Sequence, residues 1–341
     1  MKELHSGHKK AVFAAIDLGT NNCRLMLAEP CRNGKDFTIV ESFSRITRLG
    51  EGMVSSHILS DKAMERTLKV MKKLSEKMKK YKIEKGRYVA TEACRKAVNA
   101  KEFIDKATAV TGIPFEIIST QEEARLAILG CRPLVNPEAK YILVFDIGGG
   151  SSDISLAQSS ENGTLSLIGS VSIPIGVLTV SEGFTGLDIS GRAKDTIIDK
   201  VNRILSDFDD EFDVSGLIKK KELQVIGASG TVTSLGAFHL NLKRYSRHIV
   251  DGLVLSANQV RKTLTKLEGM SNLERITHPC IGPQRADLTL AGCAILEAIL
   301  NFWNFENLTI ADRGIREGIL LDLVGKAHSE PNKNIKNGKT K

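Results

Sequence analysis

The sequence has no long hydrophobic run. Its longest nearly uncharged apolar stretch, Leu288 to Leu296, is far shorter than the ~18 residues that a membrane-spanning helix needs. The apolar run that starts at Ala11 stops at Asp17, so it is shorter than the roughly 7–15 residues of a secretory signal core. These absences predict a cytoplasmic protein that does not associate with membranes.

Several standard site signatures are missing as well. The six cysteines include no C-x-x-C pair, so we expect reduced thiols rather than disulfides. The segment from Gly148 to Asp153 lacks the third glycine of G-x-G-x-x-G, and Gly338-Lys339-Thr340 has Lys333 where a P-loop requires glycine. No sequence-specific nucleic-acid module is present. The dinucleotide-binding and P-loop classes are therefore excluded.

The composition is that of an ordinary folded protein. Apolar residues make up 42% and charged residues 26% of the chain, close to globular averages. At roughly 100–200 residues per domain, a length of 341 residues favours two domains.

The formal net charge of +8 is unevenly spread. Lysines in residues 1–10 and 326–341 carry most of it, and residues 62–87 hold eleven basic and three acidic residues. Within that stretch, apolar residues recur at spacings of three and four, which places them on one side of a helix with the lysines opposite: Met64, Leu68, Met71, Leu74 and Met78. A solvated helix face explains this pattern, and a docking surface for a polyanion is the alternative.

The expected elements repeat in two halves. The first half has strands at 11–18, 24–28 and 37–46, then a helix at 61–81, a strand at 87–91, a helix at 95–111, a strand at 115–118 and a helix at 121–131. After Pro133 and Pro137 the order restarts, with strands at 141–146, 153–157 and 165–173, a helical region at 177–205, a strand at 223–226, helices from 231, at 258–267 and at 287–302, a strand at 308–310 and a helix from 315. This duplication predicts an α/β fold of two similar domains that face a central cleft.

We expect the following boundaries. Residues 1–10 form a flexible tail, 11–134 the first domain, 135–311 the second domain, 312–325 a C-terminal helix that packs on the core, and 326–341 a disordered basic tail.

Three glycine-rich segments are candidate phosphate-binding sites. Such turns can aim successive backbone N–H groups at one point, hydroxyl groups add donors, and a helix N-terminus favours an anion. Each segment could also be only a tight turn. Two of them, however, follow the first strand of each repeated half and so occupy equivalent positions, which favours a shared role. The candidates are Gly19, Thr20, Asn21 and Asn22; Gly148, Gly149, Gly150, Ser151 and Ser152; and Gly227, Ser229, Gly230 and Thr231.

Asp17 and Asp146 each lie at the end of an apolar strand. Their carboxylates would repel a bound phosphate unless a cation lay between the carboxylates and the phosphate. Mg²⁺ is usually held by one or two carboxylates, waters and substrate phosphates, so we expect Mg²⁺ as the cofactor here. The alternative is that an aspartate only accepts backbone N–H bonds at its turn.

Together, these residues resemble the exopolyphosphatase/guanosine pentaphosphate phosphohydrolase family. The resemblance runs from about residue 11 to 325 and rests on the two aspartate hairpins, ATEACRKA at 90–97, EEARL at 122–126, GASGT at 227–231, RAD at 285–287 and GIREG at 314–318. It implies two domains of the actin/hexokinase/Hsp70 superfamily, which have a ribonuclease H-like fold. It also implies Mg²⁺-dependent hydrolysis of a terminal phosphoanhydride in inorganic polyphosphate or pppGpp. In that family the second glutamate of EEARL is catalytic and an arginine grips phosphate, which map to Glu123 and Arg95.

The implied roles agree with the chemistry. Hydrolysis of a phosphoanhydride needs an oriented water, a carboxylate beside it and cations on the phosphate oxygens. Glu123, Arg95 and Mg²⁺ at Asp146 would supply these. The structural alternative for Glu123 is a capping box over residues 120–123, and for Arg95 a surface position in the first turn of a helix.

The chain departs from the family pattern at several positions. Thr20 and Asn22 stand where serines are common. Asp153, which the resemblance adds as a third candidate metal ligand, stands where many members have glutamate, whose side chain is one methylene longer. A C-terminal helical domain of long members does not follow the core, which makes processive action on long polymers a weaker expectation than cleavage. Expected partners are inorganic polyphosphate or guanosine penta- and tetraphosphate, and a homodimer is left open. The rival functions are a non-hydrolysing (p)ppGpp sensor and an actin-like ATPase or sugar kinase.

Overall fold

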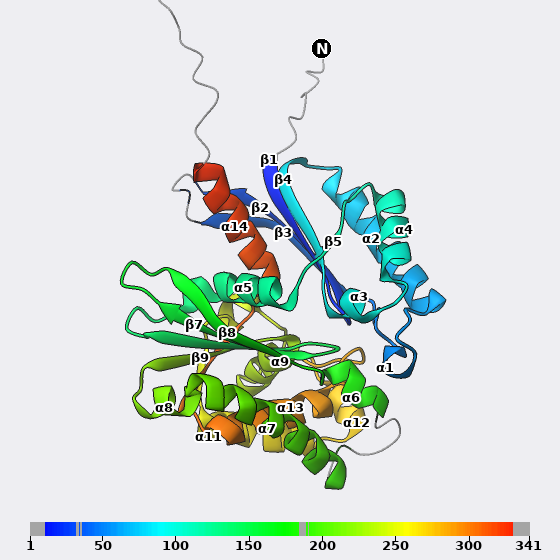
Figure 1. Cartoon of the computed structure of the whole chain (residues 1–341). Helices are drawn as coiled ribbons and strands as arrows, with labels where there is room; N and C mark the ends of the chain where they lie inside the picture. The colour runs from blue at the N-terminus through cyan, green and yellow to red at the C-terminus, as the bar shows by residue number, and fades with distance from the viewer. Residues whose placement is uncertain (1–10, 32–33, 35, 184–188, 190, 330–341) are drawn as a thin grey trace, which may run out of the picture.

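The computed structural model describes residues 11–31, 34, 36–183, 189 and 191–329. Two mixed β-sheets form its framework (Figure 1). The first sheet has the order β3-β2-β1-β4-β5, from β1 (Ala11–Leu18), β2 (Asn22–Pro30), β3 (Phe37–Ile46), β4 (Lys82–Ala90) and β5 (Glu116–Ile117). The second has the order β10-β11-β9-β6-β7-β8, from β6 (Tyr141–Ile147), β7 (Ser152–Ser159), β8 (Leu165–Ile173), β9 (Leu223–Ala228), β10 (Val254–Ser256) and β11 (Asn307–Ala311).

The two sheets repeat one topology. In each, three antiparallel strands are followed by strands parallel to the first: β4 lies beside β1 in one sheet, and in the other β9 lies beside β6 with β11 next to β9. The short β10 adds an antiparallel edge to the second sheet only. The predicted α/β fold of two actin-like domains is confirmed.

Alternating side chains of the first sheet enter two cores. Val12, Ala14 and Ile16 pack under α2 (Asp61–Met78) and α4 (Ala100–Thr111). Phe13 and Ala15 face the opposite way, toward α5 (Thr120–Cys131) and α14 (Ile315–Ser329). Because successive strand residues point to opposite faces, a continuous apolar strand such as β1 is buried on both sides.

The second sheet is also covered on both faces. Its larger core packs under helices that Figure 1 shows on the side away from the first domain, while α5 covers part of the other face through Ile128 and Cys131. The helices of the second domain are α6 (Val177–Gly183), α7 (Arg192–Phe212), α8 (Val214–Lys219), α9 (Gly230–His239), α10 (Arg247–Val250), α11 (Ala257–Glu268), α12 (Asn272–Thr277) and α13 (Thr289–Trp303).

Helices α5 and α14 lie between the sheets and cross at glycines. A Cβ on Gly130 would lie 2.1 Å from the Gly314 carbonyl oxygen, and one on Gly318 would lie 2.0 Å from that of Leu126. Both distances are far below van der Waals contact, so the helices approach this closely only because side chains are absent there.

Several predicted elements need correction. The helix expected at 95–111 is two helices, α3 (Glu92–Lys96) and α4, because Ala97 has an extended backbone. The region 177–205 is likewise divided into α6 and α7, and β10, α8, α10 and α12 were not predicted. The strand expected at 87–91 begins earlier, since β4 pairs with β1 along its whole length.

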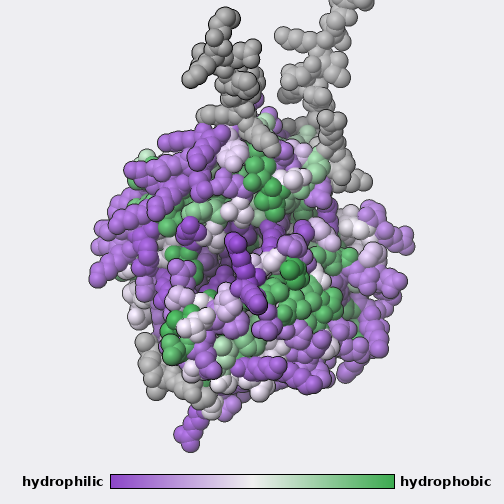
Figure 2. Space-filling view, turned by 180° about the vertical axis from the view of Figure 1, so that it is seen from behind, coloured by the Kyte–Doolittle hydropathy of each residue, from purple (hydrophilic) through white to green (hydrophobic). Residues whose placement is uncertain are grey.

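The tails and the surface complete the description. The tail predicted from residue 326 is wrong for its first residues, because α14 continues to Ser329. The rest of that tail and residues 1–10 lie outside the described residues. All six cysteines are free, as predicted. No helix in the described part of the chain is long and apolar enough to cross a membrane. Seen from behind, hydrophilic side chains cover much of the surface (Figure 2).

Candidate active site

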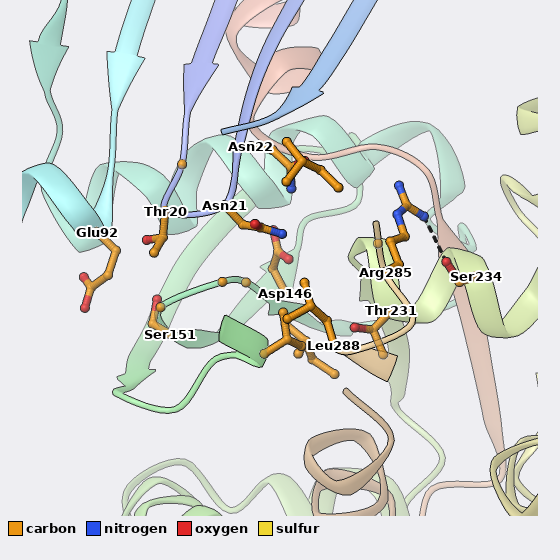
Figure 3. Close-up of a pocket in the computed structure, with 18 of the residues that line it drawn as sticks. Thr20, Asn21, Asn22, Glu92, Asp146, Ser151, Thr231, Ser234, Arg285 and Leu288 are labelled. Atoms are coloured by element: carbon orange, nitrogen blue, oxygen red, sulfur yellow. Dashed lines mark hydrogen bonds between the residues drawn. The ribbon is translucent and has the colours of Figure 1, made fainter. Parts of the chain in front are cut away.

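A cavity of about 130 Å³ lies between the two domains. Its walls come from the β1–β2 turn, the β6–β7 turn, the starts of α5 and α9, and the segment before α13 (Figure 3). Most of the predicted site residues line it: Asp17, Gly19, Thr20, Asn21, Asn22, Glu123, Asp146, Gly148, Gly149, Gly150, Ser151, Asp153, Gly230 and Thr231.

Four predicted residues do not line the cavity. Ser152 is fully buried and donates to the Ile175 carbonyl at 2.7 Å. The Ser229 hydroxyl caps α9 by accepting from the Val232 N–H at 3.0 Å. Gly227 lies within β9 against the Phe145 ring, and Arg95 lies behind the wall, as described below. The first three positions have structural roles that explain their residue types without a ligand.

The two hairpins place carboxylates at equivalent strand ends. Across the first hairpin Asp17 is opposite Arg24, and their side chains approach to 3.7 Å. Across the second hairpin Asp146 is opposite Asp153. Burial raises the pKa of Asp17, an effect that Arg24 partly offsets. Burial, with Asp153 and Asp17 nearby, raises the pKa of Asp146 to about 7, although Arg24 acts in the opposite direction. The second hairpin therefore brings two carboxylates together, and Arg24 and Arg95 offset the effect of burial on them only in part.

The glycines of the second hairpin allow it to touch the first. A Cβ on Gly149 would lie 2.8 Å from the Asn21 Cβ, and one on Gly150 would lie 2.9 Å from the Thr20 hydroxyl oxygen. The turn itself closes through a bond from the Gly148 N–H to the Ser151 carbonyl at 2.9 Å. Side chains at these two positions would therefore separate the hairpins.

Glu123 is positioned in the cavity wall by Arg95. The Arg95 guanidinium donates to Glu123 Oε2 at 2.5 Å, to Glu92 Oε2 at 2.9 Å and to the Ile118 carbonyl at 3.1 Å. The Glu123 side chain is only 13% exposed. Burial, with the charge of Asp153, raises its pKa, while Arg95 acts in the opposite direction. The carboxylate is thus held rigidly and is easier to protonate than an ordinary glutamate.

The capping alternative for Glu123 is wrong. The N-cap of α5 is Ser119, whose hydroxyl accepts from the Glu122 N–H, and Glu123 makes no side-chain cap bond. Glu122 instead pairs with Arg87 and with Arg125, and these bonds lower the pKa of its carboxyl to about 2. Of the two adjacent glutamates, Glu122 fastens the helix to its neighbours and Glu123 faces the cavity.

Sequence reasoning missed the residues at the other end of the cavity. Arg285 lies there beside Ser234, to which it donates at 2.9 Å (Figure 3). Arg24 also lines the wall. Burial and the nearby Arg24 lower the pKa of Arg285. Glu92 lines the opposite end. The cavity therefore has a carboxylate at one end and a guanidinium group at the other, and apolar side chains such as Leu235 and Leu288 complete its lining.

The loop after β3 connects the first hairpin to the second domain. The N–H groups of Thr47 and Arg48 both donate to the Asn21 carbonyl, at 2.8 and 3.0 Å. The Arg48 guanidinium reaches Asp287 at 2.8 Å, and the Gly52 N–H donates to Glu182 at 3.0 Å. The positions of the first hairpin and of the segment that carries Arg285 are thereby linked.

Among the residues that the structure describes, no group of three or more histidine, cysteine, aspartate or glutamate side chains is arranged to hold a metal ion. Two features still suit a cation that takes most of its ligands from substrate and water. Asp17 and Asp146 are poorly neutralised carboxylates in the cavity wall, and the buried Asn21 Oδ1 has no hydrogen-bond partner. Oxygen ligands of this kind are those that Mg²⁺ prefers.

Comparison with known proteins identifies the relatives of this chain. The profile of the Ppx/GppA phosphatase family matches residues 30–327. A bifunctional 3-dehydroquinate synthase/phosphatase from Fusobacterium nucleatum is 28% identical over 327 residues, which are 91% of this chain. The chain covers 46% of that relative, less than half its length.

Solved structures give the same result. An exopolyphosphatase-like protein is 28% identical with a TM-score of 0.82, over 93% of this chain and 99% of the other. A Ppx/GppA family member from Aquifex aeolicus is 28% identical with a TM-score of 0.72, over 93% and 98% of the two chains. An exopolyphosphatase from Cytophaga hutchinsonii shares the fold, at 21% identity and a TM-score of 0.79, over 92% and 98%.

Proposed function

The chain belongs to the Ppx/GppA phosphatase family, and from this membership we propose that it hydrolyses the terminal phosphoanhydride bond of inorganic polyphosphate or pppGpp, releasing orthophosphate. In this reaction a water oxygen forms a bond to the terminal phosphorus, and the bond from that phosphorus to the bridging oxygen breaks. The shortened polyphosphate, or ppGpp, leaves with the electron pair of that bond.

The observation that carries the proposal is the state of Glu123. It is a carboxylate in the cavity wall that does not cap its helix, and Arg95 fixes its direction. We assign it to orient the attacking water and accept its proton. A base is most effective when its pKa lies near the working pH, and the raised pKa of Glu123 is consistent with that role.

We assign Arg95 to hold Glu123 in place. Its guanidinium is engaged by two carboxylates and a carbonyl. The contact with phosphate that the family resemblance implies would require one of these groups to release it. Arg24 and Arg285, by contrast, line the cavity and can meet the phosphates of a bound substrate directly.

The phosphates would be held by backbone and hydroxyl donors. The two hairpins bring Thr20 and Ser151 to the same wall, and α9 presents Gly230 and Thr231 at its N-terminus. N–H groups at a helix start and in glycine-rich turns attract anions. Asp17, Asp146 and the Asn21 amide oxygen would hold Mg²⁺, with Asp153 as a further candidate. When bound, this ion would neutralise negative charge on the phosphate oxygens.

Phosphate release from long-chain polyphosphate, tripolyphosphate, pppGpp and ATP, with and without Mg²⁺, tests the proposal. We expect release from polyphosphate or pppGpp and little from ATP. Binding of pppGpp or ppGpp without any release would indicate a non-hydrolysing sensor. ATP consumption alone would indicate an actin-like ATPase or kinase.

A further inference from the structure

A stripe of lysines runs along the exposed side of α2. Lys69, Lys72 and Lys73 lie on this side of the helix, and Lys79 and Lys80 continue the line in the turn directly after its end; all five, here called the lysine stripe, are exposed. The opposite side of the helix packs on the first sheet through Met64, Met71 and other apolar residues. Within the described ranges, none of the five lysines has an ion pair.

Nearby cations differ from the stripe in this respect. Lys77, on the same helix, pairs with Glu41, and Arg66 pairs with Glu51 at 2.7 Å. On the neighbouring α4, Lys101 and Lys106 each pair with a carboxylate four residues away, at 2.8 and 2.6 Å. The five lysines of the stripe differ from these paired cations, and Glu76 is the one acidic residue between Lys69 and Lys80.

The direction of α2 connects the stripe with the cleft. The loop that precedes α2 contacts the second domain through Arg48 and Gly52, so the helix begins on the cleft side of the first domain. It ends near the start of β4, at the far end of that domain (Figure 1). At 1.5 Å per residue, the stripe from Lys69 to Lys80 extends over about 16 Å.

We propose that the lysine stripe is a docking surface for the distal part of a long inorganic polyphosphate chain whose terminal phosphate lies in the cavity. This inference rests on the proposed function for the identity of the polyanion. A chain with a charge on every phosphate can contact several of these lysines at once, whereas a compact nucleotide in the cavity cannot extend along the helix.

Polyphosphate fits this surface better than a nucleic acid does. Proteins that bind single strands place aromatic rings among their basic residues so that bases can stack on them. No aromatic residue lies within the stripe, and the adjacent Tyr81 is partly buried with its hydroxyl bonded to Glu41 at 3.1 Å. The stripe offers ammonium groups but no aromatic ring, and polyphosphate carries phosphate groups but no base that could stack on one.

The test compares two sets of four substitutions in the whole protein. One set is Lys72→Gln, Lys73→Gln, Lys79→Gln and Lys80→Gln. The control set is Lys200→Gln, Lys219→Gln, Lys220→Gln and Lys262→Gln, which removes the same charge from exposed positions on the second domain. Dissociation constants are measured for long-chain polyphosphate, tripolyphosphate and pppGpp at two salt concentrations, with far-UV circular dichroism to confirm folding.

We expect the stripe variant to bind long-chain polyphosphate about tenfold more weakly, with reduced salt dependence, and the other two ligands unchanged. The control set should bind all three ligands like the wild type. Equal losses in both sets, or an unchanged constant for long-chain polyphosphate, would overturn the proposal. Single-stranded RNA that competes equally well and loses affinity in the stripe variant would also overturn it. Because binding is measured without turnover, the stripe can be confirmed even if no substrate is hydrolysed, and refuted even if the proposed hydrolysis is correct.

Discussion

Replacing Glu123 by glutamine separates catalysis from stability. The change keeps the size of the side chain and its ability to accept a bond from Arg95, but it removes the proton acceptor. The loss of a general base typically lowers turnover by about 10²–10⁴-fold, which corresponds to about 3–5 kcal/mol of transition-state stabilisation. We expect turnover to fall by that factor and substrate affinity to stay the same or increase, because a negative charge beside the phosphates is removed.

The fold should tolerate this change. Glu123 makes no cap bond, and its carboxyl has a raised pKa because burial and Asp153 disfavour its charge. The neutral glutamine therefore avoids that cost, and Arg95 keeps Glu92 and the Ile118 carbonyl as partners. We expect a thermal midpoint within about 2 °C of the wild type.

The adjacent residue provides the matched control. Glu122→Gln weakens the bonds to Arg87 and Arg125, and the lowered pKa of Glu122 shows that these bonds favour the charged form. We expect a loss of about 1–2 kcal/mol in stability, after allowance for solvent screening, and near-normal turnover. Phosphate-release kinetics and thermal unfolding of both variants provide the comparison. A Glu123→Gln enzyme with turnover within a few-fold of the wild type would refute the catalytic assignment.

Three further outcomes follow from the site. Because Glu123 must be ionised to accept a proton, kcat/KM should rise with pH through a pKa above that of an ordinary glutamate, and a profile flat from pH 5 to 9 would contradict this. The pKa of Asp146 is about 7 in the folded protein and ~3.9 in the unfolded chain, so the free energy of unfolding of the wild type should fall as the pH rises from 4 to 7. The Asp146→Asn variant should therefore be more stable than the wild type by about 1–2 kcal/mol at pH 8 but not at pH 4. Chemical denaturation of both proteins at both pH values measures this difference. Phosphate release should stop after metal removal with EDTA and return with Mg²⁺, whereas full turnover in excess EDTA would remove Asp17 and Asp146 from the proposed metal role.

The fold could be predicted from the sequence because it repeats. Asp17 and Asp146 each end a buried strand before a turn, and this recurrence indicated two equivalent hairpins before any contact was known. Boundaries inside the helical regions were harder to predict. The break at Ala97 has no proline or glycine to mark it, and its neighbour Val98 is held by a bond to the His57 carbonyl, far away in the sequence.

The candidate site was predictable only where its residues lie within recognisable motifs. Arg285 belongs to the RAD motif, but neither it nor Arg24 was assigned a role, because they reach the cavity from separate elements and no local spacing marks them as neighbours. The choice between capping and catalysis for Glu123 depended on a one-residue shift of the helix start, from Thr120 to Ser119 as the cap. Ser229 was misplaced for the related reason that a serine before a helix serves equally as a cap or as a phosphate donor.

The glycine crossing of α5 and α14 makes the site sensitive to changes outside it. Glu123 lies in the first turn of α5, and Gly130 lies seven residues further along, about 10 Å away by the helical rise. A methyl group at Gly130 or Gly318 would push α5 and α14 apart and change the tilt of α5. Glu123 would then move relative to the hairpins of both domains. Inherited or engineered variants at these glycines would therefore resemble active-site mutants in their kinetics, although every residue around the cavity was unchanged.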